Sequence, residues 1–138
     1  MSETERDLVA ALRAELAAID PPRTCDRAAE RAGLDNPSRR DDPVLGRLVL
    51  RLARADDGLA THGDGGVSLT VDAAALAVDA AAWERLPEHC RLAWLRGRFL
   101  GHGSLSISAG RTHLEFVVPA AEAATLAARL GKMELPAS

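Results

Sequence analysis

The sequence predicts an α+β fold, and three observations carry that prediction. Alanine supplies 27 of the 138 residues, which favours helices. Apolar residues recur at helical spacing along much of the chain. Two short segments near the C-terminal end instead alternate apolar and polar residues on either side of a glycine, as the strands of a hairpin do. A chain of this length holds one core, so we expect a single domain spanning 1–138.

The charge balance limits the classes of partner. The chain has 17 basic and 20 acidic residues, a formal charge of −3, so no net positive field draws it to DNA or anionic lipid. Any nucleic-acid contact must come from a local patch. With two Phe, two Trp and no Tyr, a protein that stacks single-stranded bases is disfavoured. Sixteen arginines against one lysine suit phosphate recognition, although codon bias explains the same ratio.

The termini and cysteines bear on compartment and cofactors. The chain lacks a run of about 18 apolar residues, and residues 1–5 are acidic where a signal peptide is basic, so we expect a cytoplasmic protein without a membrane partner. Cys25 and Cys90 lie far apart in the sequence, which indicates no disulfide framework. A zinc site would need the fold to gather these cysteines with His62 and His89. We favour buried structural cysteines and expect no metal and no cofactor.

Two helices are predicted before residue 35. Leu8, Leu12 and Leu16 repeat at i, i+4 and i+8, which predicts a helix over 3–18. Two consecutive prolines follow and end it. A second, shorter helix covers about 25–33, where alanines share one side.

The segment 43–55 carries leucines at both strand and helical spacing. Asp42 suits an N-cap and Pro43 the first helical position, so we predict a helix. That helix would place three arginines on one side: Arg47, Arg51 and Arg54. They form either a row of phosphate contacts or a solvated face whose charge the neighbouring aspartates neutralise.

Turn-forming residues separate these helices from the rest of the chain. The segments 35–42 and 56–66 are polar and contain proline or glycine, which predicts loops. Alternation over 67–71 predicts a strand. Asp79 suits the N-cap of a short helix that runs through Leu86.

The best-defined unit is an α-β-β-α arrangement over 87–131. It opens with a helix over 87–100 and closes with a helix over 119–131, each begun by proline, the second ended by glycine. One stripe of the first helix consists of small residues: Ala93, Gly97 and Gly101. Glycine inside a helix costs roughly 1 kcal/mol relative to alanine. We therefore expect this stripe, and Gly97 above all, to let the backbone of another helix approach closely.

Between these helices, strands over 104–108 and 111–118 flank Ala109-Gly110, which predicts a two-residue turn with a positive-φ glycine. We expect one face of the hairpin to be buried: Leu105, Ile107, Leu114, Phe116 and Val118. We expect the other face to be solvated: Ser104, Ser106, Ser108, Arg111, His113 and Glu115.

The string from Leu95 to Ser104, followed by an alternating strand, resembles a degenerate LAGLIDADG motif, the helix-ending signature of homing endonucleases. In that motif small residues let two helices pack at a pseudo-twofold seam. An acidic residue before the final glycine holds the divalent cation for phosphodiester hydrolysis. His102 stands at that position here and Leu100 at the earlier acidic position. Imidazole lacks the charge and oxygen donors of a carboxylate, so the resemblance implies the fold without the nuclease, and no catalytic residues.

Four segments carry a closer resemblance: 90–100, 103–106, 110–118 and 25–34. They resemble the WhiA family, bacterial regulators of sporulation and cell division in which a LAGLIDADG-like domain precedes a helix-turn-helix domain. The first three segments resemble the second repeat of that domain, and 25–34 resembles the first repeat. The resemblance implies a degenerate first repeat at about 20–86 and a partial second repeat at about 87–138.

The chain departs from this family in two places. Between Gly33 and Asp42 there is no room for the first hairpin, and at Ser138 the second hairpin, the final helix and the helix-turn-helix domain are missing. We therefore expect a LAGLIDADG-like domain that is degenerate and truncated, either a shortened homologue or a fragment, with no helix-turn-helix domain in this chain.

Two functional hypotheses stay open. One is a non-catalytic domain of a WhiA-type transcription regulator that binds double-stranded DNA. Its candidate DNA-binding residues are Arg111, His113, Ser104, Ser106 and His102, for which a solvated surface is the alternative. The other is a module that binds a protein partner, such as a separate helix-turn-helix domain, or a ligand, without DNA binding of its own. The net charge and the loss of both motif acids favour it.

Overall fold

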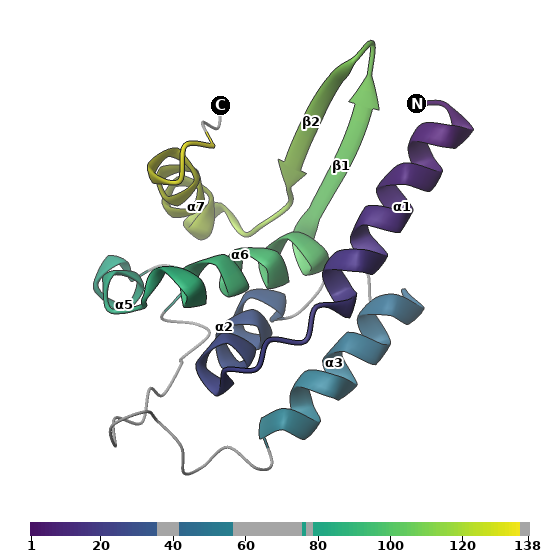
Figure 1. The fold of residues 1–138 in the computed structure, drawn as a ribbon. Coiled ribbons are helices and arrows are strands. Elements are labelled where there is room, and N and C mark those ends of the chain that lie inside the picture. The colour runs from purple at the N-terminus through teal and green to yellow at the C-terminus, as the bar shows by residue number, and fades with distance from the viewer. Residues whose placement is uncertain (36–41, 57–75, 77–78, 136–138) are drawn as a thin grey trace.

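The computed structural model describes residues 1–35, 42–56, 76 and 79–135 and confirms the α+β class (Figure 1). Its elements in chain order are α1 (Glu3–Ala18), α2 (Thr24–Leu34), α3 (Pro43–Asp56), α5 (Ala80–Glu84), α6 (Glu88–His102), β1 (Gly103–Ser108), β2 (Arg111–Phe116) and α7 (Ala120–Lys132). The predicted strand over 67–71, the loop over 57–66 and residues 36–41 of the first loop lie outside the described residues. Within them, none of the helices is long and apolar enough to cross a bilayer.

The two predicted N-caps, Asp42 and Asp79, are both present at the starts of helices. The carboxylate of Asp42 accepts a hydrogen bond from the backbone N–H of Val44 at 2.9 Å, so α3 is a helix and not a strand. Asp79 accepts one from the N–H of Ala81 at 2.8 Å at the start of α5. Both satisfy backbone donors that have no partner within the helix.

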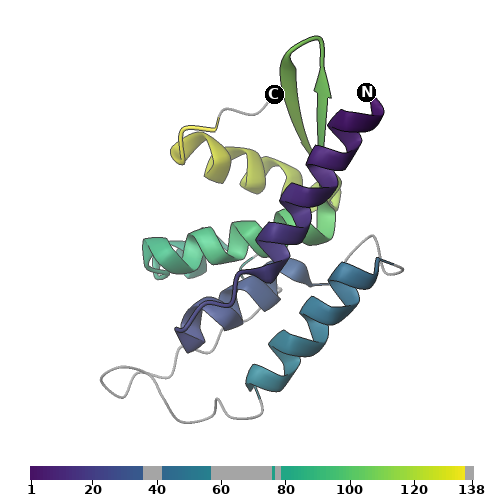
Figure 2. The same ribbon diagram turned by 45° about the vertical axis from the view of Figure 1, so that its right-hand side comes forward.

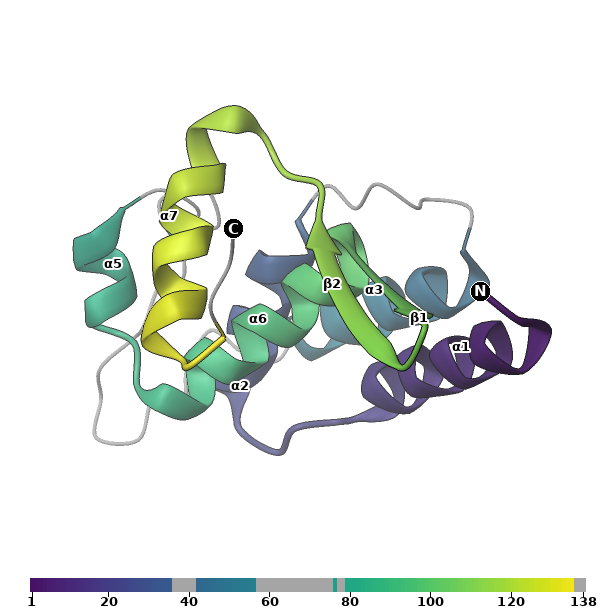
Figure 3. The ribbon, with the colours of Figure 1, turned by 90° about the horizontal axis from the view of Figure 1, so that it is seen from above.

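Helix α6 lies at the centre of the molecule and divides the core in two. Its N-terminal half packs with α2, α5 and α7, where Trp83 and Trp94 meet edge to face with ring centroids 5.1 Å apart. Its C-terminal half packs with α1, α2 and α3 around the buried leucines of α3. Seen from above, α5 and α7 lie at one end and α1 and α3 at the other (Figure 3). A helix in this position is covered on most sides.

The two strands form the expected antiparallel hairpin, which rises from the C-terminal end of α6 beside α1 (Figures 1 and 2). Ala109 and Gly110 both have positive φ, 51° and 73°, as a two-residue turn of the primed type requires. The prediction of one buried face is wrong for part of the hairpin. Leu105 and Phe116 pack against the core, whereas Leu114, directly opposite Leu105, is 46% exposed.

Several boundaries differ from those predicted, each by one or two residues. Strand β2 ends at Phe116 rather than at residue 118, and Val117 instead donates its N–H to the carbonyl of His102 at 2.9 Å. Helix α6 continues to His102. Helix α7 continues past Gly131 to Lys132, and the positive φ falls at Glu134 instead. Helix ends depend on contacts outside the local sequence, which explains shifts of one or two residues.

Candidate nucleic-acid interface

The hairpin is anchored on a helix pair, α2 and α6, whose backbones touch. A Cβ atom built on Gly97 would lie 2.1 Å from the carbonyl oxygen of Glu30. One built on Gly101 would lie 3.2 Å from a methyl carbon of Leu34, and Ala93 is buried in the same seam. The three small residues predicted to allow helix packing therefore do so, and Gly97 permits the closest approach.

The contacts across this seam are reciprocal. A Cβ atom on Gly33 would lie 2.0 Å from the carbonyl oxygen of Trp94, just as one on Gly97 would meet Glu30. Gly33 and Gly97 are separated by 64 positions, and so are Glu30 and Trp94. Two parallel helices related by a local twofold axis give this pattern. Gly33 of α2 and Gly97 of α6 therefore hold equivalent positions in the packed pair.

Ion pairs with buried carboxylates join α6 to both of its neighbours, α2 and α7. Arg96 of α6 makes two hydrogen bonds, of 3.2 and 2.8 Å, to the carboxylate of Glu30 on α2, which is fully buried. Arg98 binds the carboxylate of Glu122 on α7, with 2.8 Å between Nε and Oε1. Bidentate arginine–carboxylate geometry is the strongest form of this interaction.

The C-terminal ends of both helices are covered by buried arginines. Arg98 donates to the carbonyl oxygen of Gly33 at 3.1 Å, near the end of α2. Arg13 of α1 donates to the carbonyl oxygens of Leu100 and Gly103 at 2.6 and 3.0 Å. The last carbonyls of a helix have no intrahelical partner, so these guanidinium groups satisfy acceptors that the fold removes from water.

His102, a candidate DNA-binding residue, is the last residue of α6 and connects the two helix ends. Its Nε2 lies 2.8 Å from the carbonyl oxygen of Asp35, to which it donates because a carbonyl oxygen only accepts. The imidazole is half-buried at the base of the hairpin. Its geometry is that of a contact between helices.

The other four candidates share one face of the hairpin. The register pairs Ser104 with Glu115 and Ser106 with His113, and the strand end brings Ser108 opposite Arg111. Residues directly opposite on antiparallel strands point to the same face. Of the candidates, Ser106, Arg111 and His113 are exposed and Ser104 is half-buried. The predicted polar face therefore exists, with its basic residues toward the tip and Glu115 toward the base.

The arginine stripe on α3 does not form a continuous basic row. Arg47 is exposed, but Arg51 turns inward and donates to the carbonyl oxygens of Ala17 and Ile19 at 2.7 and 3.0 Å. The side chain of Arg54 lies outside the described part of the chain. Arg51 thus satisfies the end of α1 and is unavailable to a phosphate.

A second cluster of polar side chains lies at the opposite end of the helix pair. Cys25 and Asp26 of α2 meet His89 and Cys90 of α6, and one ligand-type atom from each falls within 4.8 Å of the other three. The burial of Cys90, together with its neighbours Cys25 and Asp26, raises the pKa of its thiol. The zinc site considered from the sequence consisted of both cysteines, His89 and His62. Asp26 was not predicted, and His62 lies outside the described residues.

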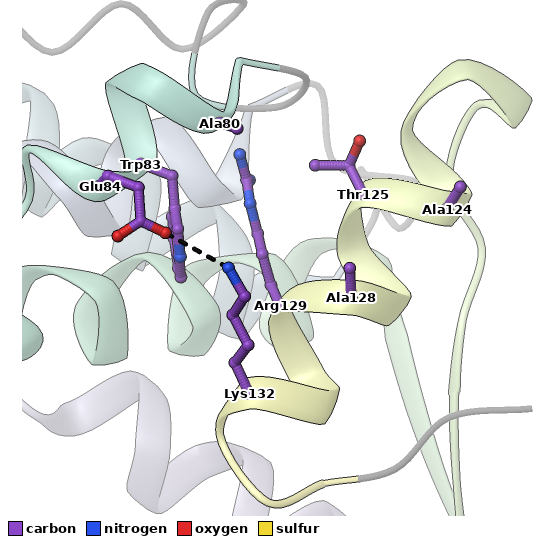
Figure 4. Close-up of a pocket in the computed structure, with 8 residues that line it drawn as sticks. All are labelled: Ala80, Trp83, Glu84, Ala124, Thr125, Ala128, Arg129 and Lys132. Carbon is purple, nitrogen blue, oxygen red and sulfur yellow. Dashed lines mark hydrogen bonds and ion pairs between the residues drawn. The ribbon is translucent and has the colours of Figure 1, made fainter.

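Helices α5 and α7 enclose a pocket of about 320 Å³ (Figure 4). Lys132 and Glu84 form an exposed ion pair of 3.4 Å across it. The guanidinium group of Arg129 lies 4.4 Å from the centroid of the Trp83 ring and forms part of the wall. The other described residues in the lining are three alanines and Thr125.

No protein-family model, no curated protein and no solved structure matches this chain.

Proposed function

We propose that this chain is a non-catalytic LAGLIDADG-like domain of a WhiA-type transcription regulator of sporulation or cell division, and that its hairpin binds double-stranded DNA. The observation that carries the proposal is the reciprocal seam between α2 and α6. The resemblance of 95–104 to the LAGLIDADG motif implies two helices that pack through small residues about a pseudo-twofold axis. Gly33 and Gly97 pack in that manner, and a hairpin begins directly after α6.

The shape of the hairpin supports a duplex as the partner. The major groove of B-DNA admits a two-stranded β-ribbon. Each strand has six residues, which makes the ribbon about 20 Å long at the usual rise per residue. Arg111 and His113 are exposed toward its tip, where phosphate oxygens are within reach of long side chains.

The position of His102 supports the non-catalytic part of the proposal. It stands where the motif carries an acidic residue, and its Nε2 is engaged by the carbonyl of Asp35. An imidazole that donates to a helix end offers no oxygen ligand to a hard divalent cation. In this position His102 connects α2 to α6 instead.

The proposal is tested by fluorescence anisotropy with a labelled mixed-sequence duplex at about 50 and 200 mM salt, a range over which several phosphate contacts cost orders of magnitude in affinity. We expect binding that weakens steeply with salt. The double variant Arg111→Ala/His113→Ala should lose most of it. Arg47→Ala, which removes an exposed arginine on α3, is the matched control and should bind as the wild type does. Equal loss in the control would contradict the hairpin interface.

A protein-interaction module is the second candidate function, and one observation favours it. Several large apolar side chains are well exposed: Leu8, Leu50, Leu92, Leu114 and Val117, at 46–66%. Leu114 and Val117 belong to the hairpin and its exit, and Leu114 lies on the face opposite Arg111 and His113. A protein partner would therefore use a different face of the hairpin from the one proposed for DNA. Absence of duplex binding at 50 mM salt, combined with lower solubility of the wild type than of a Leu114→Ser/Val117→Ser variant, would favour this function.

A further inference from the structure

The N-terminal ends of α2 and α6 bring together four side chains of the kinds that bind transition metals. Each helix contributes two consecutive residues from its first turns, Cys25-Asp26 and His89-Cys90. Nδ1 of His89 lies 2.6 Å from Oδ1 of Asp26 and 3.5 Å from Sγ of Cys90. The four ligand-type atoms lie within 4.8 Å of one another.

These distances are close to those of a tetrahedral site. With metal–ligand bonds of about 2.0–2.3 Å, ligand atoms around zinc lie roughly 3.3–3.8 Å from each other. The widest separation in the cluster, 4.8 Å, therefore needs to close by about 1 Å, and the 2.6 Å hydrogen-bond distance between Nδ1 of His89 and Oδ1 of Asp26 needs to widen by roughly 0.7 Å. Side-chain rotations of Cys25 and His89 at the partly exposed rim can supply both changes.

The donor set selects the metal. Two sulfurs, one imidazole nitrogen and one carboxylate oxygen suit Zn²⁺ and are the wrong ligands for Mg²⁺ or Ca²⁺, which take oxygen. Four protein ligands complete a tetrahedron and leave no open position, as in structural zinc sites. We propose that Cys25, Asp26, His89 and Cys90 bind one Zn²⁺ ion that joins the first turns of α2 and α6.

Burial and charge agree with this assignment. Cys90 is fully buried and Asp26 is 7% exposed, whereas the side chain of His89 is 38% exposed and leaves an entry path from solvent. On binding, each cysteine releases its thiol proton to solvent and coordinates as a thiolate. Two thiolates, one carboxylate and Zn²⁺ then carry a net charge of −1, which the partial positive charge of two helix N-termini stabilises.

The site is tested on the full chain, stripped of metal with a chelator under reducing conditions. Titration with zinc against a chromophoric chelator should give one equivalent per chain. Titration with Co²⁺ should give the intense visible bands of tetrahedral cobalt together with a thiolate-to-cobalt charge-transfer band. Weak binding, a stoichiometry well below one or a cobalt spectrum without the charge-transfer band would overturn the proposal. This readout needs no variant, so it does not depend on whether a variant folds.

Variants then assign the ligands. Cys25→Ser and Asp26→Asn change the side-chain volume little. Each should lower zinc affinity by more than the roughly 10–100-fold lost when a group that only hydrogen-bonds to a metal ligand is removed. Glu88→Gln is the matched control, because it removes an exposed carboxylate next to His89 that is outside the cluster. Equal affinity of Asp26→Asn and wild type would remove Asp26 from the site. Air oxidation to a Cys25–Cys90 disulfide at the same rate with and without zinc would also count against the proposal.

Discussion

The two ends of the α2–α6 pair are built from different chemistry although the same seam runs between them. At the N-terminal end, sulfur, carboxylate and imidazole groups of Cys25, Asp26, His89 and Cys90 meet in a closed cluster. At the C-terminal end, buried guanidinium groups satisfy the last carbonyls of both helices, and the exposed hairpin begins. The glycine contacts that set the helix spacing lie in the middle and toward the C-terminal end.

This difference assigns separate tasks to the two ends. Helix α6 has 15 residues and is therefore about 22 Å long. Side chains at one end do not touch those at the other, and effects of substitutions at such separations are usually additive. On the two proposals made above, the N-terminal end stabilises the pair and the C-terminal end positions the hairpin for its partner.

Removal of the buried carboxylate at the C-terminal end should have the largest effect. Glu122→Ala leaves the guanidinium group of Arg98 buried without its partner, which should lower the free energy of unfolding by about 3–5 kcal/mol in urea denaturation. The control is Glu84→Ala, which breaks the surface pairs of Glu84 with Lys132 and Arg91 and should cost less than about 1 kcal/mol. Similar costs for the two variants would mean that the buried pair does not hold α7 on α6.

A methyl group in the seam should affect both ends together. Gly97→Ala forces a Cβ atom against the backbone of Glu30, and neither helix can move without disturbing its packing, so the expected cost is about 3 kcal/mol of unfolding free energy. Gly46→Ala on α3 meets nothing within 4 Å and should instead gain up to about 1 kcal/mol, as alanine does in an exposed helix. Thermal or denaturant unfolding of both variants checks the prediction, and a neutral Gly97→Ala would contradict the seam.

A charge change on the hairpin should act on DNA binding and leave the other end unaffected. Arg111→Ala should reduce the slope of log affinity against log salt by about 1, the contribution of one phosphate contact. Cys25→Ser should leave that slope unchanged, provided that the variant is folded by circular dichroism. If Cys25→Ser changes the slope as much as Arg111→Ala does, the two ends are not independent.

The smallest expected effect lies in the turn of the hairpin. Ala109 has a φ of 51°, where a side chain costs about 1–2 kcal/mol and glycine does not. Ala109→Gly also increases the freedom of the unfolded chain, so we expect a net gain below about 1 kcal/mol in unfolding free energy. Thermal unfolding measures it, and a loss of stability would show that the turn has another geometry.

The elements and the seam could be predicted from the sequence because their signals are local. Helical periodicity, N-capping aspartates and the cost of Gly97 inside a helix each follow from a few neighbouring residues. The exposed outer face of the hairpin could not be predicted, since alternation shows which residues share a face and not what covers it. Leu114 is the clearest instance.

The buried polar residues also escaped prediction, for a different reason. Arg13, Glu30, Arg98 and Glu122 are buried because partners from other elements neutralise them or accept their hydrogen bonds, and those partners are distant in the sequence. Asp26 was missed in the same way. Asp26 and its neighbour Cys25 meet His89 and Cys90 only because α2 and α6 pack together, and these two pairs are far apart in the sequence. The sequence does contain a signal for this cluster: each helix has two consecutive metal-ligand residues in its first turns, Cys25-Asp26 and His89-Cys90.

The most direct test of the proposed interface is backbone NMR of the ¹⁵N-labelled chain during titration with duplex DNA at low salt. We predict that the largest changes in amide chemical shift occur in the hairpin, at Ser104, Ser106, Arg111 and His113. The amide shifts of the cluster at the other end should not change: Cys25, Asp26, His89 and Cys90. Shifts centred on α5 and α7, or no shifts at a duplex concentration far above that of the protein, would contradict it.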